Sequence, residues 1–339
     1  MIVLVSVLVS EWCSLGVGIE YGDEDEDEDE HEDGARLTDE APLAARARIA
    51  QTHGMASGRD PGIARRRVVK LGGPTRTGEA ESDDVAVEEP LEIRVAGDAL
   101  AVTMRTPGAD RELALGFLYA EGVIRSLDDV GSVAHCGRPG DDGFGNVIDV
   151  LPGPGVVLAP ERVAGTRRGT LTAAACGVCG RLTIEDLIAR CAPVTDDARI
   201  EAAALARFIR SMRDRQALFA RTGGVHAAAL FAAAAADDAP LFVREDVGRH
   251  NAVDKLVGAL IFGRALPAAG RALIVSGRTS FEIVQKAAVA GIPIVASVSA
   301  PSSLAIDLAA RMNVTLVAFL RGESMSVYSA PERIVARRP

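Results

Sequence analysis

Cys176 and Cys179 are separated by two residues in the stretch TLTAAACGVCGR, among small and flexible neighbours. A CxxC pair can hold zinc, exchange a disulfide or present a nucleophilic thiolate. The chain has only five cysteines in 339 residues. That number is odd, and a chain of this length needs no cross-links to hold its core, so we expect a reduced, cytoplasmic protein with a chemically active CxxC.

Three kinds of chemistry remain open for this pair. A structural zinc site needs two close ligand pairs, but His135 and Cys136, the nearest second pair, are adjacent and make poor simultaneous ligands. A thioredoxin-like dithiol starts a helix directly after a strand, whereas this pair lies in a Gly/Ala-rich stretch. In the third interpretation, a flexible loop presents a thiolate, which Arg167, Arg168 and Arg181 would favour.

Small, hydroxyl and charged residues recur where a predicted strand passes into a helix. They form three junctions, at residues 244–251 (REDVGRHN), 276–280 (SGRTS) and 299–303 (SAPSS). Such junctions meet at the carboxyl edge of a parallel sheet, where helix N-termini bind anions. His250, Ser276 and Arg278 are therefore candidate binding residues. The alternative is that these side chains only cap helices.

His250 is the most versatile of these side chains, as a candidate base or ligand. The alternative is an ordinary, partly buried histidine with its hydrogen bonds satisfied. Asp254 follows one turn later on the same helix face and is placed to orient it. Lys255 is interpreted as a charge at the surface or at a pocket rim.

The elements that carry these residues can be read from periodicity. VEEPLEIRVAGDALAVTM predicts a β-hairpin, and DRELALGFLYAEG predicts a helix capped by Asp110 and closed by Gly122. Short strands are expected at 130–136 and 147–151, and a long helix at 200–221. Apolar strands then alternate with helices to the end of the chain. This rhythm predicts an α/β fold whose mixed, partly parallel sheet has helices on both faces, with a smaller N-terminal β/α portion.

Charge divides the chain unevenly. The net charge is −10, but residues 1–40 hold 14 acidic residues and one basic residue, which leaves 33 acidic and 36 basic residues in the remainder. The run GDEDEDEDEHEDG predicts a disordered tail. Only 4% of residues are aromatic, which argues against base stacking on nucleic acid. The apolar start, MIVLVSVLVSEW, is too short to span a membrane.

We divide the chain into four parts on these grounds. They are a tail and linker (1–65), an N-terminal hairpin and helix portion (66–165), a mobile CxxC loop (166–182) and an α/β portion that holds the three junctions (183–339).

From residue 66 onwards the chain resembles the formate dehydrogenase accessory sulfurtransferases, the FdhD-type sulfur carrier proteins. The resemblance rests on EEPLEIRVAG, TPGADRELALGFLYAEGVI, CGVCG, REDVGRHNAVDKLVG, SGRTSFEIVQKAAVAGIPIVASVSAPSSLAIDLA and FLRGESMSVYS, in this order. The family usually has serines just before its CxxC, where this chain has Ala173 to Ala175.

The resemblance implies a sulfurtransferase that takes persulfide sulfur from a cysteine desulfurase. It delivers the sulfur to the molybdenum cofactor, bis-molybdopterin guanine dinucleotide, for formate dehydrogenase. It also implies that Cys176 carries the persulfide, that Cys179 is auxiliary, and that the protein is a homodimer. The implied cofactor-binding residues are Phe319, Leu320, Arg321, Gly322, Glu323 and Ser324.

The implied fold is similar to that of cytidine deaminases, yet the zinc signature of those enzymes, H-x-E with P-C-x-x-C, is absent from the sequence. We therefore expect no metal held by the protein itself, and no deaminase-like hydrolase. The remaining alternatives are a cofactor-binding chaperone without sulfur chemistry and a CxxC redox protein, which would need both cysteines equally.

Overall fold

The computed structural model describes residues 60–71, 80–138, 143–158, 192–234 and 237–335. The chain divides into two units, 1–40 and 41–339, and all described residues belong to the second. Cys176 and Cys179 lie outside the described residues. The four-part division of the sequence stays a prediction.

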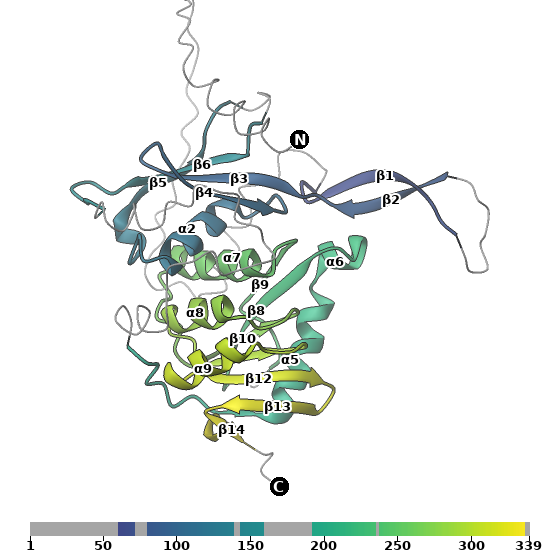
Figure 1. The fold of residues 1–339 in the computed structure, drawn as a ribbon, viewed down its shortest axis with the longest axis vertical. Helices are drawn as coiled ribbons and strands as arrows, with labels where there is room; N and C mark the ends of the chain where they lie inside the picture. Colours follow the sequence, from purple (N-terminus) through teal and green to yellow (C-terminus); the bar gives the residue numbers. More distant parts are fainter. Residues whose placement is uncertain (1–59, 72–79, 139–142, 159–191, 235–236, 336–339) are drawn as a thin grey trace, which may run out of the picture. The chain divides into compact units, whose positions relative to one another are not determined.

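The first strands form two small sheets (Figure 1). Strands β1 (Ile63–Val69) and β2 (Ala80–Ala86) pair only with each other, antiparallel. The second sheet has the order β4-β3-β6-β5, in which β3 and β6 are parallel. Its strands are β3 (Glu89–Val95), β4 (Asp98–Arg105), β5 (Val130–His135) and β6 (Val147–Pro152). The β3–β4 hairpin confirms the predicted one: Ala96 and Gly97 both have positive φ, as a tight hairpin turn requires.

Helix α2 (Asp110–Ala120) follows β4, and nine of its 11 residues are buried. Gly122 closes it with φ 73°, as predicted. The prediction that Asp110 caps it was wrong, because Ala109 occupies the N-cap and no side chain caps the helix. Asp110 instead accepts hydrogen bonds from the buried guanidinium of Arg105, at 3.1 and 3.2 Å. A buried guanidinium without an anionic partner is more destabilising than a helix without a side-chain cap, so Asp110 pairs with Arg105.

The larger sheet has six strands in the order β13-β12-β11-β10-β8-β9. Strands β10, β11 and β12 are parallel neighbours, and the other pairings are antiparallel. The sheet is therefore mixed, as predicted. Its strands are β8 (His226–Ala232), β9 (Phe242–Asp246), β10 (Arg271–Val275), β11 (Ile294–Ser297), β12 (Thr315–Arg321) and β13 (Ser324–Ser329).

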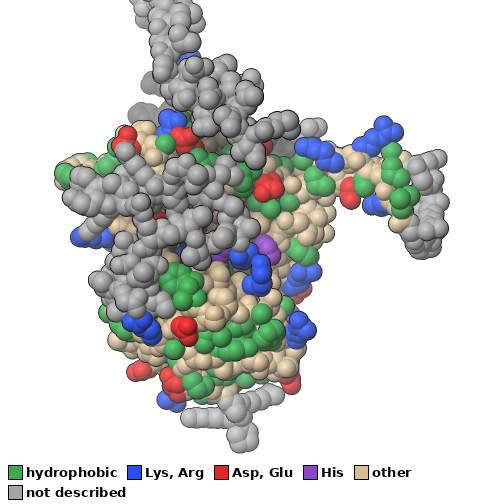
Figure 2. Space-filling view, in the orientation of Figure 1, with side chains coloured by type: hydrophobic (Ala, Val, Ile, Leu, Met, Phe, Trp, Pro, Cys, Tyr) green, Lys and Arg blue, Asp and Glu red, His purple; other side chains and the backbone are tan. Residues whose placement is uncertain are grey.

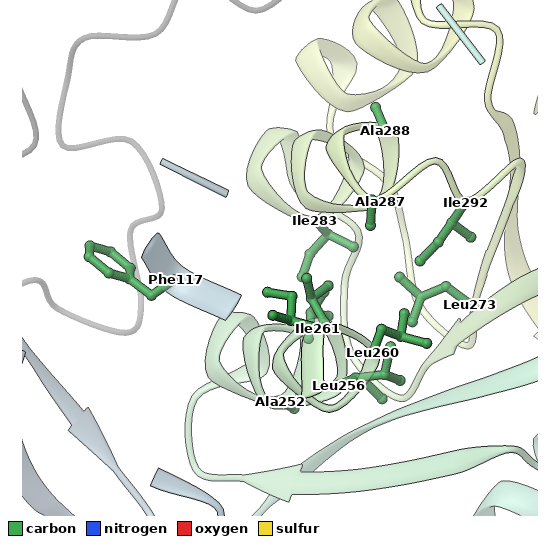
Figure 3. Close-up of a cluster of buried hydrophobic side chains, with 14 of the residues drawn as sticks. Phe117, Ala252, Leu256, Leu260, Ile261, Leu273, Ile283, Ala287, Ala288 and Ile292 are labelled. Carbon is green, nitrogen blue, oxygen red and sulfur yellow. The ribbon is translucent and has the colours of Figure 1, made fainter. Parts of the chain in front are cut away.

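Helices cover both faces of this sheet (Figure 1). On one face lie α7 (Arg249–Phe262), α8 (Phe281–Val289) and α9 (Ser303–Arg311), and on the other lies α5 (Ala202–Asp214). Alternate strand residues point to opposite faces, so Leu230 joins the core under α7 and α8, whereas Phe231 joins the core under α5. Figure 3 shows the first core, in which Leu256 of α7 and Ile283 of α8 lie near Leu273 of β10.

The helix predicted at 200–221 is divided in the structure. Ile200–Glu201 form a short strand, β7, which pairs with β14 (Ile334–Val335) near the end of the chain. Helix α5 then ends at Asp214, and α6 (Ala217–Thr222) starts anew. The break is stabilised by Glu245 of β9, whose carboxylate accepts hydrogen bonds from the first N–H groups of α6. No described helix is long and apolar enough to cross a membrane.

Candidate functional site

The ends of several strands bring the predicted junctions to one edge of the six-stranded sheet. Strands β9 to β12 run in one direction, whereas β8 and β13 run in the opposite direction, so the carboxyl ends of the former meet the starts of the latter. We call this the carboxyl edge, toward which the arrow of β12 points in Figure 1. It carries His226, Asp246, Ser276, Ser299, Arg321 and Ser324. Ligands of open α/β sheets bind at such an edge.

His226, Arg249 and Arg278 form a basic cluster at this edge. The backbone at Gly277 touches two of them: a Cβ there would lie 3.3 Å from His226 Nδ1 and 3.6 Å from Arg249 Cδ. Burial lowers the pKa of His226, and the positive charges of Arg249 and Arg278 lower it further, whereas Asp246 opposes the shift. Two cations around a neutral imidazole make a site suited to an anion.

His226 is the functional candidate that sequence reasoning missed. It is a single histidine at the start of an apolar strand, and nothing beside it in the sequence sets it apart. Figure 2 shows histidine side chains next to basic ones on the surface of the described residues.

Replacing Arg278 with Ala is expected to raise the pKa of His226, because one of the two nearby cations is removed. The measurement is an NMR titration of the His226 imidazole. Arg321→Ala is the control, since Arg321 is also exposed at this edge but is not among the groups that shift His226. An unchanged pKa in Arg278→Ala would show that Arg278 lies too far away to form the cluster.

Lys255 corrects one expectation from the sequence. It is 2% exposed rather than a rim charge, and its Nζ lies 2.7 Å from Asp246 Oδ2 and donates a hydrogen bond to the Thr106 carbonyl at 2.8 Å. Asp246 also accepts hydrogen bonds from Gly248 N and Asn251 Nδ2. The buried Asp246 carboxylate is stabilised by the Lys255 cation. Because Lys255 belongs to α7, this ion pair holds the end of β9 against the first turns of the helix.

His250 is buried, and its ring contacts Ser280, the last residue of the junction at 276–280. Its Nε2 is 2.8 Å from Ser280 Oγ, and its Nδ1 is 3.8 Å from Glu282 Oε2. Asp254, which we expected to orient His250, is paired with Lys286 at 2.7 Å instead. The carboxylate placed to orient the imidazole is therefore that of Glu282, on the neighbouring helix.

The serines of the junctions do different things. Ser302 caps α9 by accepting a hydrogen bond from Ala305 N, so the capping alternative holds for this residue. Ser276 Oγ accepts a hydrogen bond from Ala227 N and thereby ties β10 to β8. Ser280 is the N-cap of α8 without making a cap bond.

The stretch 319–324 covers the end of β12, the turn at Gly322 and Glu323, and the first residue of β13. Gly322 has φ 58° in this turn, and Phe319 has φ 53° at an irregularity in the β12–β13 pairing. Phe319 and residues 321–324 are exposed, so their side chains face solvent at the carboxyl edge. Leu320 differs, because it is 2% exposed and belongs to the core beneath α5.

Within the described residues, no group of three or more His, Cys, Asp or Glu side chains is placed to hold a metal ion. The cysteine pair lies outside this part of the chain, so the absence of a resident metal stays a prediction.

Comparison with known proteins shows which protein family the chain resembles. The model of the FdhD/NarQ family matches residues 86–335. A protein named sulfur carrier protein FdhD from Anaeromyxobacter dehalogenans is 55% identical over 278 residues, which cover 80% of this chain and 93% of the relative. A protein of the same name from Mycobacterium tuberculosis is 50% identical over 260 residues, covering 74% of this chain and 92% of the relative.

A solved structure agrees with these relatives. It is the crystal structure of a putative formate dehydrogenase accessory protein from Desulfotalea psychrophila, with a TM-score of 0.59 and 29% sequence identity. The match covers 80% of this chain and 98% of that chain. Because the family model matches the chain from β3 to β14 and these relatives are about half identical to it, this chain belongs to the FdhD/NarQ family.

Proposed function

We propose that this chain is a sulfurtransferase that carries sulfur as a persulfide on Cys176 and delivers it to the molybdenum cofactor of formate dehydrogenase. The observation that carries the proposal is the 55% identity, over 80% of the chain, to a protein named as a sulfur carrier. The CGVCG stretch supplies the thiol that such a carrier needs.

The chemistry follows from thiol–disulfide exchange. The Cys176 thiolate attacks the terminal sulfur of a persulfide on a cysteine desulfurase, the S–S bond of the donor breaks, and the donor leaves as a thiolate. Cys176 then holds the sulfur as S–SH. Cys179 is auxiliary, because a persulfide carrier needs one sulfur atom for attack and not a dithiol.

The carboxyl edge supports a nucleotide-bearing substrate. Bis-molybdopterin guanine dinucleotide carries diphosphate groups, and the basic cluster of His226, Arg249 and Arg278 offers cationic groups for them. Ser276 and the exposed residues of the stretch 319–324, among them Arg321, lie at the same edge. The cofactor is the cargo in this proposal and not a resident group.

The proposal implies partners and a setting. A cysteine desulfurase supplies the sulfur, the formate dehydrogenase catalytic subunit receives the loaded cofactor, and the carrier works as a cytoplasmic homodimer. A cross-linking experiment with both partner proteins would test these assignments.

Sulfur loading tests the function directly. Wild type, Cys176→Ala and Cys179→Ala are incubated with a cysteine desulfurase and cysteine, and their intact masses are measured. We expect a gain of one sulfur atom in wild type and in Cys179→Ala, and none in Cys176→Ala, because only Cys176 carries the persulfide.

Other outcomes favour other functions. Loss of the adduct in both single variants would favour a redox dithiol. No adduct on any protein would favour a cofactor-binding chaperone, a role for which the basic cluster would suffice.

A further inference from the structure

His226 lies where three strands meet at the carboxyl edge. Strand β8 lies between β10 and β9, and His226, its first residue, is the cross-strand partner of Asp246. On the other side, Ser276 N donates a hydrogen bond to the Ala227 carbonyl at 3.0 Å, and Ala227 N donates one to Ser276 Oγ at 2.8 Å. These bonds hold the start of β8 against the junction at 276–280.

The side chain of His226 points to the face of the sheet that α7 and α8 cover. Ala228 and Leu230, two and four residues later, belong to the core under these helices, and alternate residues of a strand share a face. A Cβ on Gly277 would lie 3.3 Å from His226 Nδ1 and 3.6 Å from Arg249 Cδ. The backbone of the junction therefore passes directly beside the imidazole and the stem of Arg249.

The junction also holds a buried polar atom without a partner. Thr279 is 1% exposed, and its Oγ1 makes no hydrogen bond within the described part of the chain. Buried hydroxyl groups are normally hydrogen-bonded, so this one is expected to meet a ligand or water. Thr279 directly precedes Ser280, the N-cap of the nine-residue helix α8, whose N-terminus adds partial positive charge. With the exposed Arg278 beside it, this end of α8 favours an oxyanion.

The charges that act on His226 come from β9, α7 and the junction before α8. Burial lowers the pKa of His226, Arg249 of α7 and Arg278 of the junction lower it further, and Asp246 of β9 opposes them. The imidazole is therefore expected to be neutral near pH 7 when the edge holds no anion.

Other charged groups of the elements around β8 have partners of their own. Arg271 lies at the far end of β10, opposite Ala232. The remaining pairs are Lys255 with Asp246, Lys286 with Asp254, Glu282 with His250 and Lys286, Arg244 with Glu112, and Glu245 with the first N–H groups of α6.

We propose that a doubly charged oxyanion binds among Arg249, Arg278 and Thr279, and that its binding is coupled to the uptake of one proton by His226. The proposal deepens the carrier function and rests on it for the natural occupant, a diphosphate group of the cofactor. The proton comes from solvent and goes to the unprotonated imidazole nitrogen, and no other covalent bond forms or breaks.

Electrostatics accounts for the coupling. The anion offsets the repulsion that the two guanidinium groups exert on an imidazolium, and it adds an attraction of its own. Because coupling between two binding sites is reciprocal, the proton strengthens anion binding by the same factor. Affinity for the anion is therefore highest below the pKa of His226 in the free protein. It falls as pH rises to the higher pKa in the complex, so a diphosphate is released more readily once the imidazole has lost its proton.

The test uses sulfate as the probe, because sulfate remains a dianion across the neutral range and brings no proton of its own. The histidine resonances of wild type are titrated by NMR from about pH 5 to about pH 9, once in sodium sulfate and once in sodium chloride of the same ionic strength. The amide signals of Gly277 and Arg278 report sulfate binding. His135, which faces Asp110 near the smaller sheet, is the internal control.

Sulfate should strengthen proton binding to His226 about tenfold, which is a coupling of ordinary size. The midpoint of its titration then moves up by about one pH unit, whereas that of His135 stays the same. In wild type the affinity for sulfate should fall about tenfold as pH rises across this range, and in His226→Gln it should change much less. Arg278→Ala should weaken sulfate binding at every pH, because it removes one of the cations.

Two results in wild type would overturn the proposal, whether or not the variants fold. If the amides of Gly277 and Arg278 do not respond to sulfate, the anion does not bind there. If they respond but the midpoint of His226 is the same in both salts, binding is not coupled to the proton. Neither result bears on sulfur loading. Failure of wild type to gain sulfur would overturn the carrier function alone and leave the coupling with a different natural occupant.

Discussion

Gly258→Ala is expected to destabilise the protein by about 3 kcal/mol, although alanine is the better helix former. A Cβ on Gly258 of α7 would lie 1.9 Å from the backbone oxygen of Glu112 in α2. A Cβ on Gly116 of α2 would likewise lie 1.9 Å from the backbone oxygen of Asp254. Both obstacles are backbone atoms of a helix, so one helix must move. The gain in helix propensity offsets only about 1 kcal/mol of this cost.

The displacement would also disturb ion pairs that depend on the close crossing. The Glu112 carboxylate accepts hydrogen bonds from buried Arg244 of β9, and Asp254 pairs with Lys286 of α8. The effect of a single methyl group is therefore expected to extend beyond the crossing point.

Urea unfolding followed by circular dichroism would measure this change. Ala310→Gly, on the exposed side of α9, calibrates helix propensity alone and should cost about 1 kcal/mol. Should Gly258→Ala prove as stable as wild type, the two helices do not approach as closely as described.

Lys286→Met is expected to cost about 3–5 kcal/mol near pH 8, because it leaves buried carboxylates without their cation. Lys286 is 1% exposed and lies 2.7 Å from Asp254 Oδ1. Burial raises the pKa of Asp254 to about 7, even though Lys286 opposes the shift. For Lys286, burial alone would lower the pKa, but Asp254 and Glu282 together outweigh it and raise the pKa. We therefore expect the ammonium group to stay charged.

The loss in Lys286→Met should depend on pH. Without the ammonium group, the pKa of Asp254 rises further above that of the unfolded chain, 3.8. A carboxyl group with a raised folded-state pKa contributes stability at low pH, and this contribution is lost as pH rises through that pKa. The variant should thus be closer to wild type at about pH 5 than at about pH 8.

Denaturant titrations at both pH values provide the measurement. Lys286→Met combined with Asp254→Asn is the matched control, since it removes one carboxylate as well and should recover part of the stability at pH 8. An equal loss at both pH values, with no recovery in the double variant, would contradict the charge argument.

Local signals predicted the parts of the fold that depend on neighbours in the sequence. The Ala96-Gly97 hairpin follows from turn chemistry, and the alternation of strands and helices after residue 226 follows from periodicity. The split of the helix predicted at 200–221 could not be foreseen, because its causes are Glu245 and the distant strand β14.

The candidate site shows the same division. The three junctions were visible because each combines small and polar residues in one stretch of sequence. The burial of Lys255 could not be predicted from the sequence. Its partner Asp246 requires a cation only because the folded sheet buries the Asp246 carboxylate. His226 was missed for a similar reason: its significance comes from Arg249 and Arg278, which only the fold brings near it.

The order in which the chain is synthesised matters for one contact described above. Strand β14 pairs with β7, which follows the cysteine-containing part of the sequence. Arg333, beside β14, donates hydrogen bonds to the carbonyl of Asp196, just ahead of β7. A nascent chain on the ribosome therefore cannot form the β7–β14 pairing or the Arg333 contacts until residues 333–335 have been made. The final placement of residues 196–201 is therefore expected late in synthesis, after the strands of the six-stranded sheet have been made.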